Sequence, residues 1–201
     1  MKNKSVSTST VGFMCLALAG WMISMPAAGW FDKVYLHGTG NLHALAGLLA
    51  IMGVLAFVHG RTLDCVIFFG GAGLFWGTYL YQVGLPQGGM VEPGSYSGWY
   101  FFVWALYFCW VWFGSFKAEL QRMLFLLGLW LTLLALAIGA WTGIHGFTLA
   151  GGYLGLITSI LAAITSAIEI IGHGRVGLPN EPGRSIAQVL PGPGADQRAA
   201  Q

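Results

Sequence analysis

Six long apolar stretches follow one another along the chain, separated by short polar turns. Each has about the 20 residues that a helix needs to cross the hydrocarbon core of a bilayer. The pattern therefore predicts an all-α, polytopic membrane protein built as a six-helix bundle. Its spans are predicted at about residues 11–31, 36–58, 63–83, 98–116, 123–143 and 149–172, with a cytoplasmic leader at residues 1–10 and a disordered cytoplasmic tail at residues 180–201.

The last stretch carries a row of small and polar residues along one side of an otherwise apolar helix. Similar rows of small residues occur in the first and fifth stretches. In a membrane, small residues let helix backbones approach closely, so these rows are predicted to face protein rather than lipid. At helical spacing, the row in the last stretch consists of Gly151, Gly155, Thr158, Ala162, Thr165 and Glu169.

The composition excludes an ordinary soluble domain. Charged residues make up 8% of the chain and the mean hydropathy is +0.70, whereas about a quarter of the residues in soluble domains are charged. Of the nine Lys and Arg residues, only Lys33 falls on the outer side of the six-span arrangement. Because positive residues collect in cytoplasmic loops, both termini are predicted to be cytoplasmic.

Two titratable side chains are candidate proton or gating groups, Glu169 and His43. Glu169 is the carboxylate that we place within a span, near the cytoplasmic end of the last one. An acid inside a membrane is costly unless it faces protein or water, so it acts either as a functional group or as the partner of Arg175 or a loop cation. His43 lies toward the outside with His37 and His145, where these rings either sense external acidity or are simply solvated.

No phosphate loop, catalytic triad, pair of carboxylates or HExxH motif occurs, so no enzyme activity and no cofactor are predicted. Cys15, Cys65 and Cys109 lack the spacing of a metal site and are interpreted as packing residues. Because we expect no buried cation in the spans, the bundle suits a small neutral or transiently neutral solute. No nucleic-acid partner is expected.

Several segments carry a resemblance to a known family. They are GWYFFVWALYFCWVWFGSFK at residues 98–117, LLALAIG at 133–139, AGGYLGLITSILA at 150–162, GRVGLP at 174–179, and Gly73, Phe75 and Trp76 in the third span. With them the chain resembles the acetate uptake transporter family, also called succinate–acetate permeases. The resemblance covers nearly the whole chain in helix count and loop placement, and it is weakest in the first two helices.

The resemblance implies a homo-oligomer, commonly a hexamer, with one pore per protomer and a narrow constriction at mid-membrane. That constriction falls on Leu16, Ala72 and Leu129 of this sequence. Ala72 departs from the family, which usually has Tyr there, and Trp76 and Tyr79 are candidates to refill the space. STSTVG at residues 7–12 replaces the family's asparagine-proline-alanine-proline-leucine-glycine signature, either as new hydrogen-bond donors or as part of a plain leader.

The first functional hypothesis is a channel or proton-linked permease for acetate-like short monocarboxylates in a prokaryotic cytoplasmic membrane. The alternatives are a pore for a small neutral solute, such as urea, an amide or ammonia, and a non-transporting accessory subunit of a membrane complex. The predicted solute pathway consists of Leu16, Ala72, Phe75, Trp76, Trp104, Leu129, Thr132 and Thr158, with the two threonines expected to act as hydrogen-bond donors.

Overall fold

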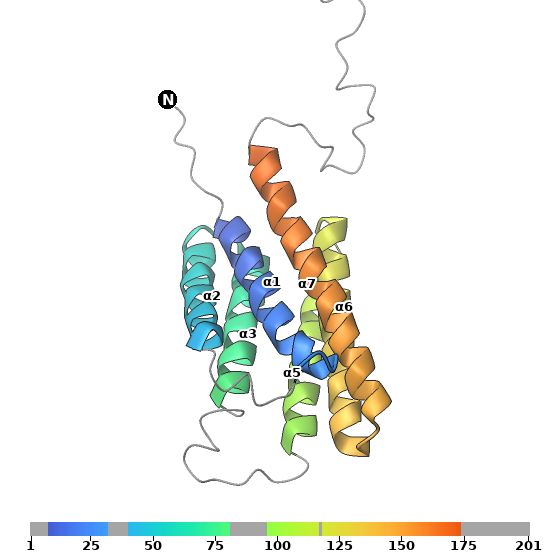
Figure 1. The fold of residues 1–201 in the computed structure, drawn as a ribbon. Coiled ribbons are helices and arrows are strands. Elements are labelled where there is room, and N and C mark those ends of the chain that lie inside the picture. Colours follow the sequence, from blue (N-terminus) through green and yellow to red (C-terminus); the bar gives the residue numbers. More distant parts are fainter. Residues whose placement is uncertain (1–7, 32–39, 81–95, 117, 174–201) are drawn as a thin grey trace, which may run out of the picture.

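A computed structural model describes residues 8–31, 40–80, 96–116 and 118–173, and all of its regular structure is helical (Figure 1). Most of the predicted leader, the predicted tail and the residues around Lys33 and His37 lie outside the described residues. The predicted topology of the termini therefore stays a prediction. The described helices are α1 (Thr8–Ala27), α2 (Gly40–Val58), α3 (Thr62–Tyr79), α5 (Tyr96–Gly114), α6 (Leu120–Thr142) and α7 (His145–His173).

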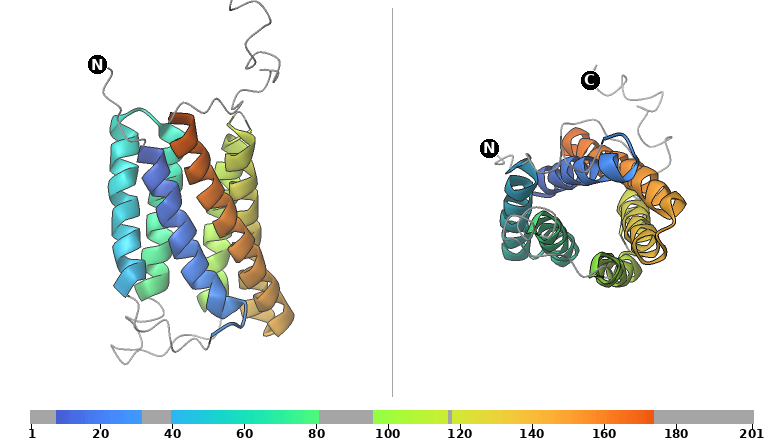
Figure 2. Two further views of the ribbon diagram at one scale, coloured as in Figure 1. Left: turned by 45° about the horizontal axis from the view of Figure 1, so that its top comes forward. Right: turned by 60° about the horizontal axis from the view of Figure 1, so that its bottom comes forward.

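The helices alternate in direction and stand side by side as one bundle (Figures 1 and 2). Consecutive helices α1 and α2, α2 and α3, α5 and α6, and α6 and α7 pack against each other, and α1 also packs along α7. The start of α1 and the end of α7 lie at the same end of the bundle. This end also holds the α2–α3 turn and the start of α6, and we call it the charged end.

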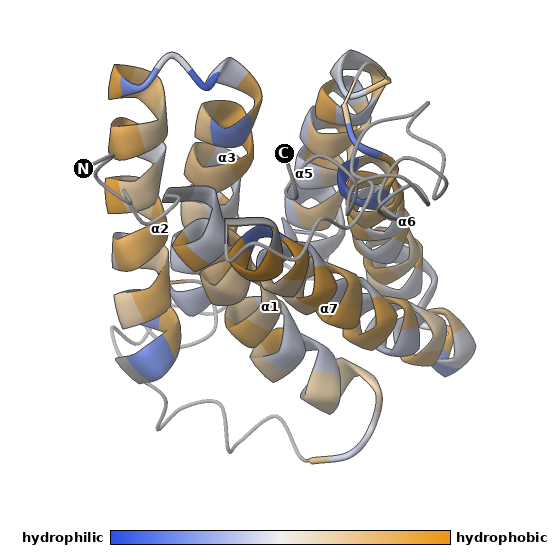
Figure 3. Ribbon diagram, turned by 90° about the horizontal axis from the view of Figure 1, so that it is seen from above, coloured by the Kyte–Doolittle hydropathy of each residue, from blue (hydrophilic) through white to orange (hydrophobic). Residues whose placement is uncertain are grey.

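All six predicted apolar stretches form helices in the described residues, which confirms the all-α fold. By length and composition, α1, α2, α6 and α7 are long and apolar enough to cross a membrane. Figure 3 shows apolar colouring over most of the bundle and hydrophilic colouring mainly at helix ends. Helix α1 begins at Thr8, three residues before the predicted span, because its first turn is polar and packs against charged groups rather than lipid.

The predicted small-residue row on α7 faces protein, as expected. All six of its residues are buried, while large apolar residues of the same helix, such as Ile157 and Ile164, are exposed. Gly152 shows how close the approach is, because a Cβ atom there would overlap the backbone at Ala27 and Ala28, just where α1 ends. Small residues on α7 therefore allow α1 to lie directly against it.

Aromatic rings of α5 pack onto glycines of α3. A Cβ at Gly73 would lie 2.7 Å from the Trp104 ring, and one at Gly77 would lie 2.5 Å from the hydroxyl of Tyr100. The Tyr100 hydroxyl also donates a 2.7 Å hydrogen bond to the carbonyl of Leu74. Rings and glycines therefore join these two helices, and this gives the deep Trp104 a packing role.

Candidate functional site

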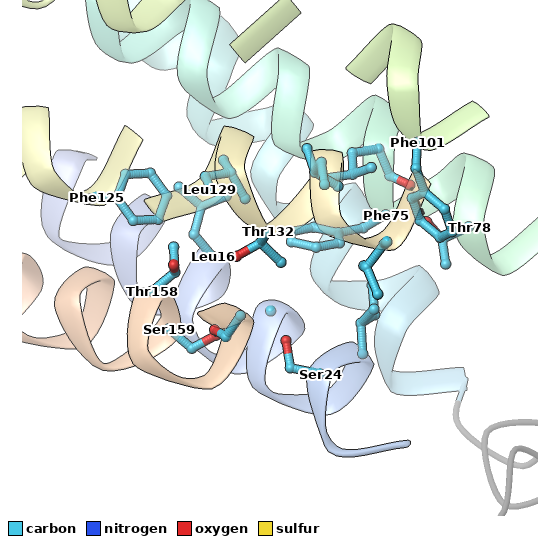
Figure 4. Close-up of a pocket in the computed structure, with 16 residues that line it drawn as sticks. Leu16, Ser24, Phe75, Thr78, Phe101, Phe125, Leu129, Thr132, Thr158 and Ser159 are labelled. Atoms are coloured by element: carbon cyan, nitrogen blue, oxygen red, sulfur yellow. Dashed lines mark hydrogen bonds between the residues drawn. The ribbon is translucent and has the colours of Figure 1, made fainter. Parts of the chain in front are cut away.

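A small cavity lies in the interior of the bundle between α1, α3, α5, α6 and α7 (Figure 4). Its volume is about 40 Å³, whereas one buried water needs roughly 10–15 Å³ measured in this way. It therefore accommodates about three water molecules, or a solute with a similar number of non-hydrogen atoms. Phe125 and Leu129 lie toward one end of the cavity, and Thr78 and Phe101 lie toward the other.

Five hydroxyl groups line the cavity among mostly apolar side chains, and four of them donate their protons to carbonyls of their own helices. The hydrogen bonds are 2.7–2.8 Å long. A hydroxyl that has donated its proton still accepts through its oxygen lone pairs. The donors and acceptors are Thr78 to Leu74, Thr132 to Gly128, Thr158 to Leu154, and Ser159 to Gly155.

This hydrogen bonding corrects the expected role of the two pathway threonines. Thr132 and Thr158 do line the cavity, as predicted, but their protons are held by the backbone. Since a threonine hydroxyl has a single proton, these groups present acceptors to the cavity rather than donors. The lining in this arrangement therefore suits a solute that carries its own O–H or N–H.

The cavity brings together five of the eight predicted pathway residues. Leu16 comes from α1, Phe75 from α3, and Leu129, with Thr132, from α6, while Thr158 comes from α7. Two of the three residues predicted at the constriction, Leu16 and Leu129, are among them. The role of these residues in transport stays a prediction.

Ala72, Trp76 and Trp104 do not line this cavity. Ala72 is buried in the packed core beside it. Trp76 is 39% exposed, and its ring lies 4.7 Å from that of His43 on α2, which is 5.1 Å from the ring of Tyr79. The α3 ring that lines this cavity is Phe75, and the expectation that Trp76 and Tyr79 refill the space left at Ala72 stays a prediction.

His43 lies in the first turn of α2, and its ring is exposed. Its described neighbours are the aromatic rings of Trp76 and Tyr79 on α3. These contacts place His43 on the opposite end of the bundle from Glu169, beside α3 rather than in the cavity. A gating role for His43 stays a prediction.

An aromatic layer separates the cavity from the charged end of the bundle. Phe13 of α1 contacts Phe68 of α3 and Phe125 of α6 edge to face, with ring centroids 5.5 and 5.6 Å apart. All three rings are at most 2% exposed. A Cβ at Gly12 would overlap the Phe68 ring, so this glycine, the residue that the chain shares with the family signature, makes room for the layer.

Beyond the aromatic layer, charged side chains form a compact cluster. Arg122 of α6 pairs with Asp64 of α3 at 2.9 Å and with Glu169 of α7. Arg61, which precedes α3, pairs with Asp64 at 2.8 Å and lies 4.0 Å from Glu169. Asp64 is 2% exposed, Glu169 8% and Arg122 13%. Glu119 borders the cluster, 3.7 Å from Nε of Arg122.

This charged cluster gives Glu169 a described cation partner and corrects the expected absence of a buried cation, while a role of Glu169 as a proton or gating group stays a prediction. Glu169 pairs with a loop cation, but that cation is Arg122, which is largely buried. Asp64 and Arg122 were not predicted as site residues. The available signal was Arg61 three residues before Asp64 at the start of an apolar stretch, a spacing that suits an ion pair across one helical turn.

The hydroxyls that replace the family signature take part in the same cluster. Ser9 donates a 2.8 Å hydrogen bond to Asp64, and Thr10 contacts Glu169 at 3.3 Å. Ser9 also accepts a 2.7 Å hydrogen bond from Arg61. For Ser9 and Thr10, the prediction that these hydroxyls act as hydrogen-bond donors, rather than being only part of a leader segment, is therefore confirmed.

The described fold and cavity define an integral membrane protein whose apolar helices enclose a small interior space. The fold is similar to a solved structure, that of the bacterial acetate channel SatP. The two structures align with a TM-score of 0.78 and 19% sequence identity over 88% of this chain and 99% of that chain. The resemblance to the acetate uptake transporter family is thereby confirmed at the level of the fold. No protein-family profile and no curated protein sequence matches the chain.

Proposed function

We propose that the chain is a membrane channel for acetate-like short monocarboxylates. The observation that carries the proposal is the small hydroxyl-lined cavity at the centre of a bundle whose fold matches the acetate channel. An acid of this class has about as many non-hydrogen atoms as the cavity holds waters. We further propose six membrane spans, cytoplasmic termini, a homo-oligomer and no enzyme activity.

The solute crosses the cavity in its protonated form. Among the described residues no cation lines the cavity, so a carboxylate there would be stripped of water without a partner, which is strongly unfavourable. The acid O–H, in contrast, finds acceptor oxygens on residues such as Thr132 and Thr158. Each acid molecule therefore carries its own proton across the cavity. Uptake is coupled to a proton in this way, without a separate proton-carrying group in the protein.

The first test reconstitutes the purified protein in liposomes and follows the internal pH after an acetate jump. Acetate is expected to acidify the interior faster than in protein-free liposomes, while urea at matched osmolarity produces no faster swelling. Faster urea swelling with no acetate effect would favour the neutral-solute pore, since amide N–H groups also suit acceptor oxygens. No protein-dependent flux of either solute would favour the alternative of a non-transporting accessory subunit.

Acetate uptake is expected to rise as external pH falls. A carboxyl group with a pKa near 4 loses about tenfold in protonated fraction for each pH unit above that value. The initial rate at a fixed total acetate concentration should therefore fall several-fold from pH 6 to pH 7, after subtraction of the protein-free leak. A protein-dependent rate that is equal at both pH values would contradict transport of the acid.

A further inference from the structure

Arg122 has hydrogen-bonding capacity that its present partners leave unused. Its Nη1 donates to Asp64 and its Nη2 donates to Glu169 and, at 3.4 Å, to Ser9, but its buried Nε has no hydrogen-bond partner among the described residues. Glu119 is the nearest carboxylate to Nε, at 3.7 Å. One edge of the guanidinium, formed by Nε and Nη2, is therefore only half used.

That unused edge is what a free carboxylate would need. A guanidinium binds a carboxylate best through two parallel N–H···O hydrogen bonds from one edge. Glu169 takes only the Nη2 side, since it is tethered to α7 and is also contacted by Thr10 of α1. A small carboxylate free of such a tether could engage both nitrogens.

Arg122 is also close to the cavity along the bundle axis. Its guanidinium carbon lies 5.5 Å from the centre of the Phe13 ring, and Phe13 contacts Phe125, which lines the cavity. Thus one aromatic layer separates the cavity from the guanidinium. On the far side of the cluster, Arg61 is 35% exposed and Glu119 is 39% exposed, so the cluster opens toward solvent there.

From this geometry we propose that Arg122 is a carboxylate-binding station at the charged end of the pore, and that Glu169 occupies it as an internal carboxylate between solute passages. The inference rests on the proposed function for the identity of the solute. An acid that has crossed the cavity ionises where it meets the water-accessible groups beyond Phe13. Its carboxylate then competes with Glu169 for the same edge of Arg122.

The test measures binding of sodium acetate to purified protein by titration calorimetry at pH 8, where acetate is ionised. Replacing Glu169 with glutamine (E169Q) removes the competing carboxylate charge from Nη2, which keeps its 3.4 Å hydrogen bond to Ser9, and is expected to tighten acetate binding at least tenfold over wild type. Removing the guanidinium as well (R122Q/E169Q) is expected to abolish that gain. Glu119→Gln removes the same charge from beside Nε while Glu169 still pairs with Nη2, so its gain in acetate affinity is expected to be smaller than that of E169Q.

Two results would overturn the station. One is an E169Q protein that elutes normally in size-exclusion chromatography yet binds acetate no more tightly than wild type. The other is an equal gain in R122Q/E169Q, which would place the bound acetate elsewhere. If E169Q fails to fold, Glu169→Ala removes the same internal carboxylate and is expected to give the gain, and a folded protein without it would equally refute the proposal.

Flux measurements separate this inference from the proposed function. In the liposome assay, E169Q is expected to lower the acetate concentration for half-maximal flux several-fold, and R122Q/E169Q is expected to raise it above wild type. If the charged cluster only holds the helix ends together, R122Q/E169Q will conduct acetate as well as E169Q or better. That result would contradict a carboxylate-binding role for Arg122. A wild-type protein that conducts no acetate, combined with tight acetate binding by E169Q, would refute the proposed channel. It would not refute the proposed carboxylate-binding role of Arg122.

Discussion

Replacing Arg122 with glutamine (R122Q) is expected to lower the free energy of unfolding by about 3–5 kcal/mol. Arg122 is only 13% exposed and joins the buried carboxylates of Asp64 and Glu169. Without it, the nearest described cation to the two buried negative charges from α3 and α7 is Arg61, whose side chain is 35% exposed. Breaking a buried ion pair from one side is costly because the remaining charge keeps its desolvation penalty.

The measurement is the apparent melting temperature in detergent, which should fall by about 10 °C for R122Q. Arg61→Gln is the matched control: it removes the same charge from the more exposed side and leaves Arg122 with both carboxylates. Its expected cost is about 1 kcal/mol or less. Adding E169Q to R122Q should restore part of the loss, because one of the unpaired buried charges is then removed. Equal melting temperatures of R122Q and wild type would show that the charged cluster contributes little to stability.

Filling the cavity from α6 is expected to stop the flux. Leu129 lines the cavity near Phe125, and its replacement by phenylalanine (L129F) adds three non-hydrogen side-chain atoms to a space of about 40 Å³. Because that volume holds only about three waters, the larger ring leaves little room for a solute. Acetate-driven acidification should then fall at least tenfold, toward the rate of protein-free liposomes.

The matched control places the same substitution on the exposed side of the same helix. Leu124 is 38% exposed, so Leu124→Phe should leave the acetate flux unchanged. Overpacking at Leu129 costs about 1–3 kcal/mol, so the melting temperature of L129F must be compared with that of wild type before its flux is interpreted. A folded L129F protein with normal acetate flux would place the solute route outside this cavity.

The two variants test different parts of one route. L129F acts within the apolar cavity, whereas R122Q acts beyond the aromatic layer formed by Phe13, Phe68 and Phe125. A neutral acid meets acceptor oxygens in the first part and a guanidinium in the second. The structure thus separates a region that suits the protonated solute from a region that suits its carboxylate.

Several features of the site were open to prediction from the sequence because they depend on local patterns. The spacing of Gly155, Thr158 and Glu169 alone indicates which side of the last helix faces protein, since helical periodicity fixes which residues share a face. That side is buried in the structure. Leu16 and Leu129 were likewise placed at the constriction through the family resemblance, and both line the cavity.

The errors arose where the answer depends on contacts between distant segments. Arg122 looked like an ordinary loop cation because its partners, Asp64 and Glu169, are 58 and 47 residues away in sequence. Trp76 looked like a pore-lining ring, but helix rotation directs it toward His43 and leaves Phe75 facing the cavity. Neither outcome follows from the residue type or its spacing along one helix.

The sequence by itself determined the helices, their apolar character and the small-residue rows through which they pack, because each follows from periodicity and composition within a single segment. Only the tertiary structure decided which hydroxyls reach the cavity, that the protons of Thr132 and Thr158 are already committed to the backbone, and that Arg122 lies between two buried carboxylates. These features depend on the relative rotation and depth of five helices. That arrangement is set by the packing of the whole bundle, which no single segment encodes.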